Sequence, residues 1–206
     1  MKKTFTVIIA VILLSGISFA GIGITTGVNL ANFNGVAGLD LSSRTGFSVG
    51  LFLDHAGSGF SVMPSILYTQ KGASYSQQSY QSGYAVKIDV DLKYDYIECP
   101  IMGRYVIETA SNIKPFLLAG PYLGILLSSK ISGTGSVQGY SQTATVEANI
   151  PDQKTVDIGL AFGGGIKVEL GSTALNINLK YSFGLMSVDN ADTKNSSFSI
   201  MAGISF

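Results

Sequence analysis

Hydrolytic chemistry is the first possibility that the residue types raise, and it centres on the single histidine, His55. Asp54 precedes this histidine and Ser58 follows it closely, so one short stretch holds the side-chain types of a Ser–His–acid hydrolase. The stretch joins two predicted strands, however, and a histidine in such a turn is ordinarily a solvated residue. Because the sequence offers no other histidine as a base, we predict no catalytic residue and no enzymatic activity.

The sequence offers few candidate ligands for a metal or a cofactor. Calcium prefers oxygen ligands, and four residues near the end of the chain could offer them loosely. These are Asp189, Asn190, Asp192 and Asn195. Spacing of this kind is common by chance, and Cys99 is the only cysteine, so it cannot form an internal disulfide. The run Gly163–Gly165 lies within a predicted strand without a following Lys-Ser pair, so it is not a phosphate loop. We predict neither a metal nor a cofactor.

Composition narrows the class of protein. The chain has 206 residues, of which 46% are hydrophobic and 13% are charged, and this charged share is about half the usual one. The formal net charge of zero gives no basic surface for nucleic acid, which we exclude as a partner. A soluble protein with so few charges would have difficulty covering its surface with polar groups, whereas a membrane protein need not do so.

The first twenty residues have the pattern of a secretory signal peptide. Lys2 and Lys3 precede a short apolar run, and Ser18 and Ala20 are small residues placed for cleavage after Ala20. We therefore predict a signal peptide at 1–20 and one domain at 21–206. No later stretch suits a membrane-spanning helix, which needs about 20 apolar residues. An exported, apolar chain of this kind is either a soluble β protein or a transmembrane β-barrel.

Strict alternation of apolar and polar residues identifies the strands, because successive side chains of a strand point to opposite faces. The clearest case sets Leu175, Ile177, Leu179, Tyr181 and Phe183 against the polar residues between them. Eight strands are predicted, at about 21–31, 44–54, 59–74, 86–107, 114–130, 154–170, 174–185 and 196–206, of which the fifth is apolar on both parities. In the fourth segment the apolar parity changes at Ile97, which suggests a β-bulge.

The connections between these segments alternate strictly between long and short, as they do in outer-membrane barrels with long loops outside and short turns in the periplasm. We therefore predict an all-β, eight-stranded antiparallel up-and-down transmembrane β-barrel with long extracellular loops and short periplasmic turns. The apolar parity, including residues 175–183, is expected to face lipid. The final Phe206 falls on the apolar parity and resembles the signal that the barrel assembly machinery reads.

The interior of an eight-stranded barrel is just wide enough for side chains to fill it, so inward charges must find one another. Counting residues up each strand from its nearest short turn predicts two polar clusters. The upper, mixed-charge cluster contains Arg44, Lys71, Glu98 and Asp157. The lower cluster has excess positive charge and contains Arg104, Lys167 and Lys180, with Asp54 and Glu169. Such pairs ordinarily just satisfy a packed interior; gating or ligand binding is the alternative.

Four segments resemble the PorT-type outer-membrane β-barrel family, which is common in Bacteroidetes-like bacteria. They are SILYTQKGA (65–73), YIECPIMGRY (96–105), KPFLLAGPYLGILLS (114–128) and VDIGLAFGGGIKVEL (156–170). The resemblance covers nearly all of residues 21–206. It implies a barrel in the bacterial outer membrane and brings no catalytic residues. Some members of the family are linked to a protein secretion pathway.

Three functions remain open from the sequence. The first is a structural or interaction barrel that meets a surface partner through Tyr75–Tyr84 and Tyr140–Thr145, which are rich in Tyr, Ser and Gln. The second is a narrow channel or apolar-ligand carrier, whose lumen would be lined or plugged by Phe116, Leu118, Tyr122 and Leu126. The third is an accessory of a secretion system with a periplasmic protein partner. Outer-membrane lipid and the barrel assembly machinery are expected partners in all three cases.

Overall fold

The computed structural model describes residues 21–35, 41–55, 59–81, 84–137, 143–151, 153–190 and 192–206. The predicted signal peptide, residues 1–20, and its cleavage site lie outside the described residues. The strands are β1 (Gly21–Asn34), β2 (Ser42–Asp54), β3 (Gly59–Gln81), β4 (Tyr84–Val106), β5 (Ile113–Val137), β6 (Thr143–Asn149), β7 (Val156–Leu170), β8 (Thr173–Gly184) and β9 (Lys194–Ser205).

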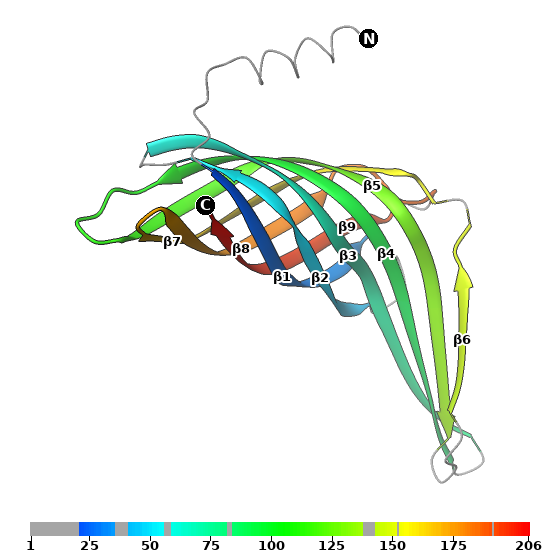
Figure 1. Ribbon diagram of the computed structural model, residues 1–206. Coiled ribbons are helices and arrows are strands. Elements are labelled where there is room, and N and C mark those ends of the chain that lie inside the picture. The colour runs from blue at the N-terminus through cyan, green and yellow to red at the C-terminus, as the bar shows by residue number, and fades with distance from the viewer. Residues whose placement is uncertain are drawn as a thin grey trace, which may run out of the picture.

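Eight of these strands form a closed ring, in which each strand is antiparallel to its neighbours (Figure 1). Sequence neighbours pair around the ring, and β1 pairs with β9 to close it, from Gly23 opposite Ser205 to Asn34 opposite Lys194. β6 stands outside the ring, because it pairs only with the far end of β5. The predicted all-β, eight-stranded up-and-down barrel is therefore confirmed. Among the described residues, no helix is long and apolar enough to cross a membrane.

The alternation in β8 shows how the sequence produces the two faces of the barrel wall. The structure places Leu175, Ile177, Leu179, Tyr181 and Phe183 on the outer face. The polar residues between them point inward, and Asn176 and Ser182 are buried. Leu179 is 48% exposed. Inverted alternation of this kind, polar inside and apolar outside, suits a barrel surrounded by lipid.

This arrangement makes a prediction about Leu179, which lies near the middle of β8. We expect Leu179→Arg to lower the free energy of unfolding by about 2–4 kcal/mol, the cost of a cation near the bilayer midplane. Urea titration in lipid vesicles measures this loss. The matched change Ser172→Arg, in the exposed turn between β7 and β8, is expected to cost little. Equal costs for the two variants would contradict a lipid-facing β8.

The structure corrects two predicted loops, 74–85 and 131–153, which are largely strand. β3 runs on to Gln81 and β4 begins at Tyr84, so this hairpin extends far beyond the barrel (Figure 1). β5 likewise continues to Val137 and pairs there with β6. The Ser, Gln and Gly content indicated loops, but strand propensity depends on context, and here the backbone ladder simply continues from the barrel. We call this projecting part of β3, β4, β5 and β6 the extension.

The change of parity at Ile97 is not a bulge in β4, contrary to the prediction. The buried residues of β4 stay on one parity from Tyr94 through Arg104. From Tyr94 toward the extension, the apolar residues lie on the inward face. From Tyr94 toward the short turns, they lie on the outward face. The change of apolar parity therefore marks where β4 leaves the barrel. One extra residue does occur at this level, but in β5, where the pairing shifts opposite Asp95 and Tyr96.

Candidate functional site in the barrel lumen

Three charged side chains from three strands meet in the upper half of the lumen, toward the extension. The Lys71 ammonium of β3 lies 2.5 Å from Glu98 Oε1 of β4 and 3.2 Å from Asp157 Oδ2 of β7. None of the three side chains is more than 3% exposed. Each falls on the inward parity of its strand, and a buried charge is tolerated only when it is paired. We call these three residues the upper cluster.

The upper cluster is held by further polar partners. Asp157 Oδ2 also accepts hydrogen bonds from the Tyr122 hydroxyl at 3.2 Å and from Asn195 Nδ2 at 2.9 Å. Asn195 Nδ2 also lies 3.2 Å from the hydroxyl oxygen of Tyr96, and the Lys71 ammonium lies 4.3 Å from the centre of the Tyr122 ring. The network joins five strands, and its two carboxylates outnumber its single cation.

Arg44 was predicted in this cluster, but it sits at its edge. The Arg44 guanidinium donates a hydrogen bond to the backbone carbonyl oxygen of Lys71 at 3.0 Å and is only half-buried. Within the part of the chain that the structure describes, Arg44 makes no ion pair with a carboxylate. It therefore caps the upper cluster without balancing its charge.

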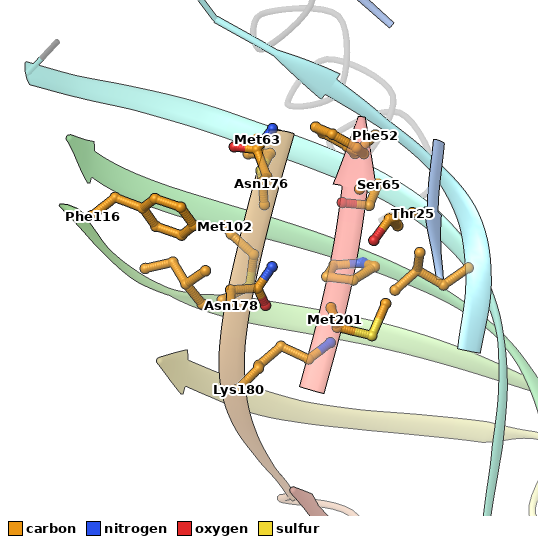
Figure 2. A pocket seen from close by; sticks show the side chains of 14 residues that line it. Thr25, Phe52, Met63, Ser65, Met102, Phe116, Asn176, Asn178, Lys180 and Met201 are labelled. Carbon is orange, nitrogen blue, oxygen red and sulfur yellow. The ribbon is translucent and has the colours of Figure 1, made fainter. Parts of the chain in front are cut away.

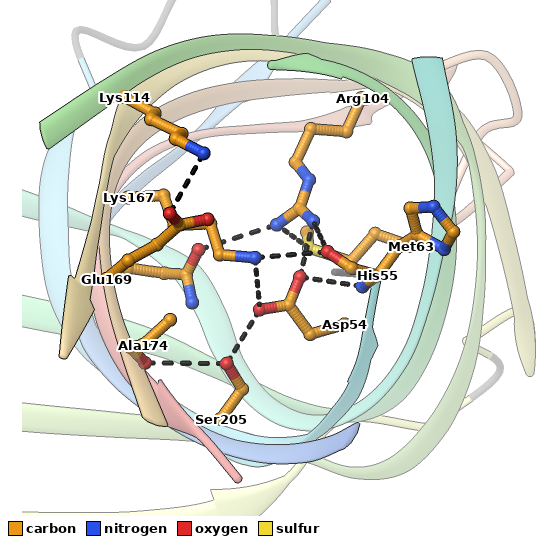
Figure 3. Close-up of polar contacts among 10 residues, drawn as sticks. Asp54, His55, Met63, Arg104, Lys114, Lys167, Glu169, Ala174 and Ser205 are labelled. Atoms are coloured by element: carbon orange, nitrogen blue, oxygen red, sulfur yellow. Dashed lines mark hydrogen bonds and ion pairs between the residues drawn. The ribbon is translucent and has the colours of Figure 1, made fainter. Parts of the chain in front are cut away.

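A second group of charges fills the lower end of the lumen, near the short turns (Figure 3). Asp54 at the end of β2 forms ion pairs with Arg104 and with Lys167, whose ammonium lies 3.3 Å from Asp54 Oδ2. The Ser205 hydroxyl donates to the same carboxylate at 2.6 Å. Arg104 and Lys167 both donate to the His55 carbonyl oxygen. We call Asp54, Arg104 and Lys167 the lower cluster; its two cations outnumber its one carboxylate.

Glu169, predicted with the lower cluster, instead pairs at the barrel mouth. Its carboxylate lies 2.9 Å from the Lys114 ammonium, at the start of β5 (Figure 3). The sequence reasoning missed Lys114. The available signal was that Lys114 and Glu169 both lie next to short turns at the same end of the barrel, where neighbouring strands β5 and β7 pair.

Lys180 belongs to neither cluster, although it was predicted in the lower one. No hydrogen bond or ion pair of Lys180 is formed within the described ranges. The charged groups that act on it are Glu98 and Lys71 of the upper cluster. Its side chain lines a cavity together with Asn176 and Asn178 (Figure 2). Barrel strands tilt, so residues at equal counts from their turns do not lie at equal heights.

Apolar side chains fill much of the remaining lumen. One buried group is formed by Met102, Val106, Phe116, Leu118, Tyr122 and Ala161. A second, toward the extension, is formed by Phe33, Ala73, Tyr94, Tyr96 and Val188. Phe116, Leu118 and Tyr122, which the sequence could assign either to a channel wall or to a plug, are each at most 3% exposed. The lumen is therefore packed rather than open.

The candidate calcium ligands do not converge. Asp189 accepts a hydrogen bond from the Thr193 backbone, Asp192 accepts one from Ser187, and Asn195 is committed to the upper cluster. Among the residues that the structure describes, no group of three or more His, Cys, Asp or Glu side chains is placed to hold a metal. The glycines of β7 serve close packing, because a Cβ on Gly163 would lie 2.0 Å from the Leu179 carbonyl oxygen of β8.

The extension has two unlike faces. The face continuous with the lumen is apolar on β4, β5 and β6, whereas β3 places Tyr75, Gln77 and Ser79 on it. It carries Val86, Ile88, Val90, Ile131, Val146 and Ala148. Ile88 is 47% and Val146 is 69% exposed. Between them lie Gly133 and Gly135, where an added Cβ would meet no atom within 4 Å. This apolar face is therefore open to a partner.

The opposite face of the extension is charged and hydrogen-bonded within itself. Lys87 pairs with Asp89 at 2.9 Å, and Lys130 pairs with Glu147 at 3.1 Å. The Ser76 hydroxyl, which donates to Asp89, and the Lys87 ammonium hold the pKa of that carboxyl below its ordinary value. The charged face is therefore well solvated and satisfied at neutral pH, in contrast to the apolar one.

Solved structures of small outer-membrane barrels are similar to this chain. Neisserial surface protein A is 16% identical with a TM-score of 0.47, over 90% of this chain and 97% of that one. Ail of Yersinia pestis is 17% identical with a TM-score of 0.43, over 90% and 98%. OprG of Pseudomonas aeruginosa is 13% identical with a TM-score of 0.44, over 90% and 95%.

Comparison with curated proteins gave no match. Residues 15–190 match the family described as outer membrane protein beta-barrel domain. This match covers most of the chain and agrees with the closed ring of strands, the apolar outer wall and the polar interior. The chain belongs to the outer membrane protein beta-barrel domain family.

Proposed function

We propose that this outer-membrane barrel is a non-enzymatic interaction protein, whose binding surface is the apolar face of the extension. The observation that carries this proposal is the exposure of Ile88 and Val146 on a sheet that projects beyond the barrel. An exposed cluster of large apolar side chains, bordered by polar residues, commonly marks an interaction site. In this proposal the extension lies outside the cell, since long connections of such barrels lie there.

The partner that fits this surface is an extended, apolar segment of another surface protein. Such a segment could lie along Gly133 and Gly135, between the side chains of β4 and those of β6. Among the described strands, β6 pairs only with β5, so a further strand could join its outer edge by β-augmentation. Backbone hydrogen bonds would then supply affinity, and the apolar side chains would supply selectivity.

Site-specific photo-crosslinking in intact cells tests the proposal. A photoreactive residue at Ile88 or Val146 is expected to give one discrete adduct of higher mass. At Lys87, the neighbouring position on the charged face, we expect several-fold less adduct. Equal labelling at the three positions, or no adduct at any of them, would overturn the proposed interaction surface.

The alternative function, a narrow channel or apolar-ligand carrier, makes a different prediction. Because both charged clusters and the apolar groups occupy the lumen, we expect the purified barrel to give no stable ionic current in planar lipid bilayers. Single-channel recording measures this directly, with an open porin as the positive control. Reproducible conductance steps from the wild-type protein would favour the channel.

Three finer predictions accompany the proposal. Cleavage after Ala20 would release the signal peptide during export. Phe206 is 60% exposed and its backbone bonds to Ile22 at the seam between β1 and β9, which suits a residue that the barrel assembly machinery reads. Kinship with the PorT-type family, and with it a role as an accessory of a secretion system, stays a prediction from the sequence motifs.

A further inference from the structure

A small cavity lies in the lumen beside Lys180 (Figure 2). Its volume is about 40 Å³, which is room for about three water molecules. Its wall is mixed. Met63, Met102, Met201 and Phe116 supply apolar surface, and Asn176 and Asn178 supply amides. A volume of this size suits a small ion better than an acyl chain or a sugar.

Among the described residues that line this cavity, only Lys180 is charged. Among the described residues, six charged side chains are buried in the lumen, three cations and three carboxylates: Lys71, Arg104 and Lys167 with Asp54, Glu98 and Asp157. These six bind one another within the two clusters. Lys180 is therefore a cation outside these pairs, and the carboxylate that acts on it, Glu98, is already bound to Lys71.

The polar groups around Lys180 also favour an anion. Asn178, two residues before Lys180 on the same face of β8, forms no side-chain hydrogen bond within the described ranges. Asn176 lies farther along the strand, where its side-chain oxygen accepts a hydrogen bond from Arg104 at 3.4 Å and its buried amide nitrogen has no partner within the described ranges. An unpaired buried donor costs about 1–3 kcal/mol. An anion beside Lys180 would satisfy the ammonium and the amide of Asn178 together.

We propose that the cavity binds one small monovalent anion, of the halide class, between the Lys180 ammonium and the side-chain amide of Asn178. The apolar part of the wall lowers the local dielectric constant, which strengthens the attraction between the ion and Lys180. The same wall selects against strongly hydrated divalent anions, because it cannot replace their water. The site lies within the barrel and is independent of the extension and its proposed partner.

Bromide is the probe, because it scatters anomalously and is close to chloride in size. Crystals of the full barrel are grown in sodium bromide, and in parallel the unfolding midpoint is measured in sodium bromide and in sodium gluconate at equal ionic strength. We expect an anomalous peak within hydrogen-bond distance of Lys180 Nζ and a higher midpoint in bromide. Lys180→Met is expected to lose both, and Lys114→Met, at the barrel mouth, to retain both.

Lys180→Met replaces an unpaired cation by an apolar side chain, so it is expected to fold. Three results would overturn the proposal. The first is a wild-type cavity without bromide. The second is a water that bridges Lys180 to Glu98 in place of the ion. The third is a bromide peak that persists in Lys180→Met, which would mark an adventitious ion only.

Discussion

Replacing Lys71 by methionine is expected to lower the free energy of unfolding by about 3–5 kcal/mol, because it removes one partner of a buried ion pair. The ammonium is the cation within 4.0 Å of both Glu98 and Asp157. Without it, two carboxylates face each other in a packed lumen. Urea titration in lipid vesicles measures the change, with the mobility of unheated protein on gels as a check of folding.

A double variant separates lost charge balance from lost packing. Lys71→Met combined with Glu98→Gln is expected to recover part of the loss, since the remaining carboxylate keeps the Tyr122 and Asn195 hydrogen bonds. The matched control is Lys114→Met, which breaks the more exposed pair with Glu169 and is expected to cost about 0–1 kcal/mol. If the control costs as much as Lys71→Met, burial does not set the energy of these pairs.

Asp54→Asn is the second change with a large expected effect, again about 3–5 kcal/mol. Asp54 is the carboxylate that Arg104 and Lys167 share, and its loss leaves two buried cations close together. The amide can still accept a bond from Arg104, but it no longer balances charge. Unfolding in urea at low and high salt measures the loss, which buried charges should show with little salt dependence.

Two further variants test whether the loss of stability comes from uncompensated charge. Asp54→Asn with Lys167→Met removes one of the two uncompensated cations, so we expect part of the stability to return. Ser205→Ala removes a hydrogen bond to the same carboxylate and leaves both ion pairs in place, so its cost should be about 0.5–1.5 kcal/mol. A double variant as unstable as Asp54→Asn alone would contradict the charge argument.

The two clusters divide the lumen charge unevenly. The upper cluster has an excess carboxylate, and the lower cluster has an excess cation. Lys180 lies where its charge acts on the upper cluster. The net charge of the lumen therefore differs between its two ends. The charges of the two clusters come from β2, β3, β4 and β7, and pairing between different strands allows a small interior to hold them.

Alternation within single strands is enough to determine much of the fold. In β8 the residues 175–183 reveal which parity faces outward, because the pleat fixes side-chain direction with a period of two. The same rule places Lys71, Glu98, Arg104, Asp157 and Lys167 on inward faces. Ring size follows from counting such segments, and the alternation of loop lengths distinguishes the two ends of the barrel.

The tertiary structure decided which inward charges meet. Strand tilt and register set heights in the lumen, and neither can be counted from one strand alone. For this reason Arg44 lies at the edge of the upper cluster, and Glu169 pairs with Lys114 at the mouth. Lys180 likewise faces a cavity instead of the lower cluster.

In the extension, too, local sequence and tertiary structure determine different features. From the sequence, Tyr75–Tyr84 and the Gly- and Ser-rich stretch after Ile131 have the composition of loops, and local composition carries no information about a partner strand. In the folded protein these segments lie beside strands that already run in register, so each added residue gains backbone hydrogen bonds. Local pattern indicated the two faces of the strands within the barrel; long-range pairing determined how far the strands extend and which side chains share the lumen.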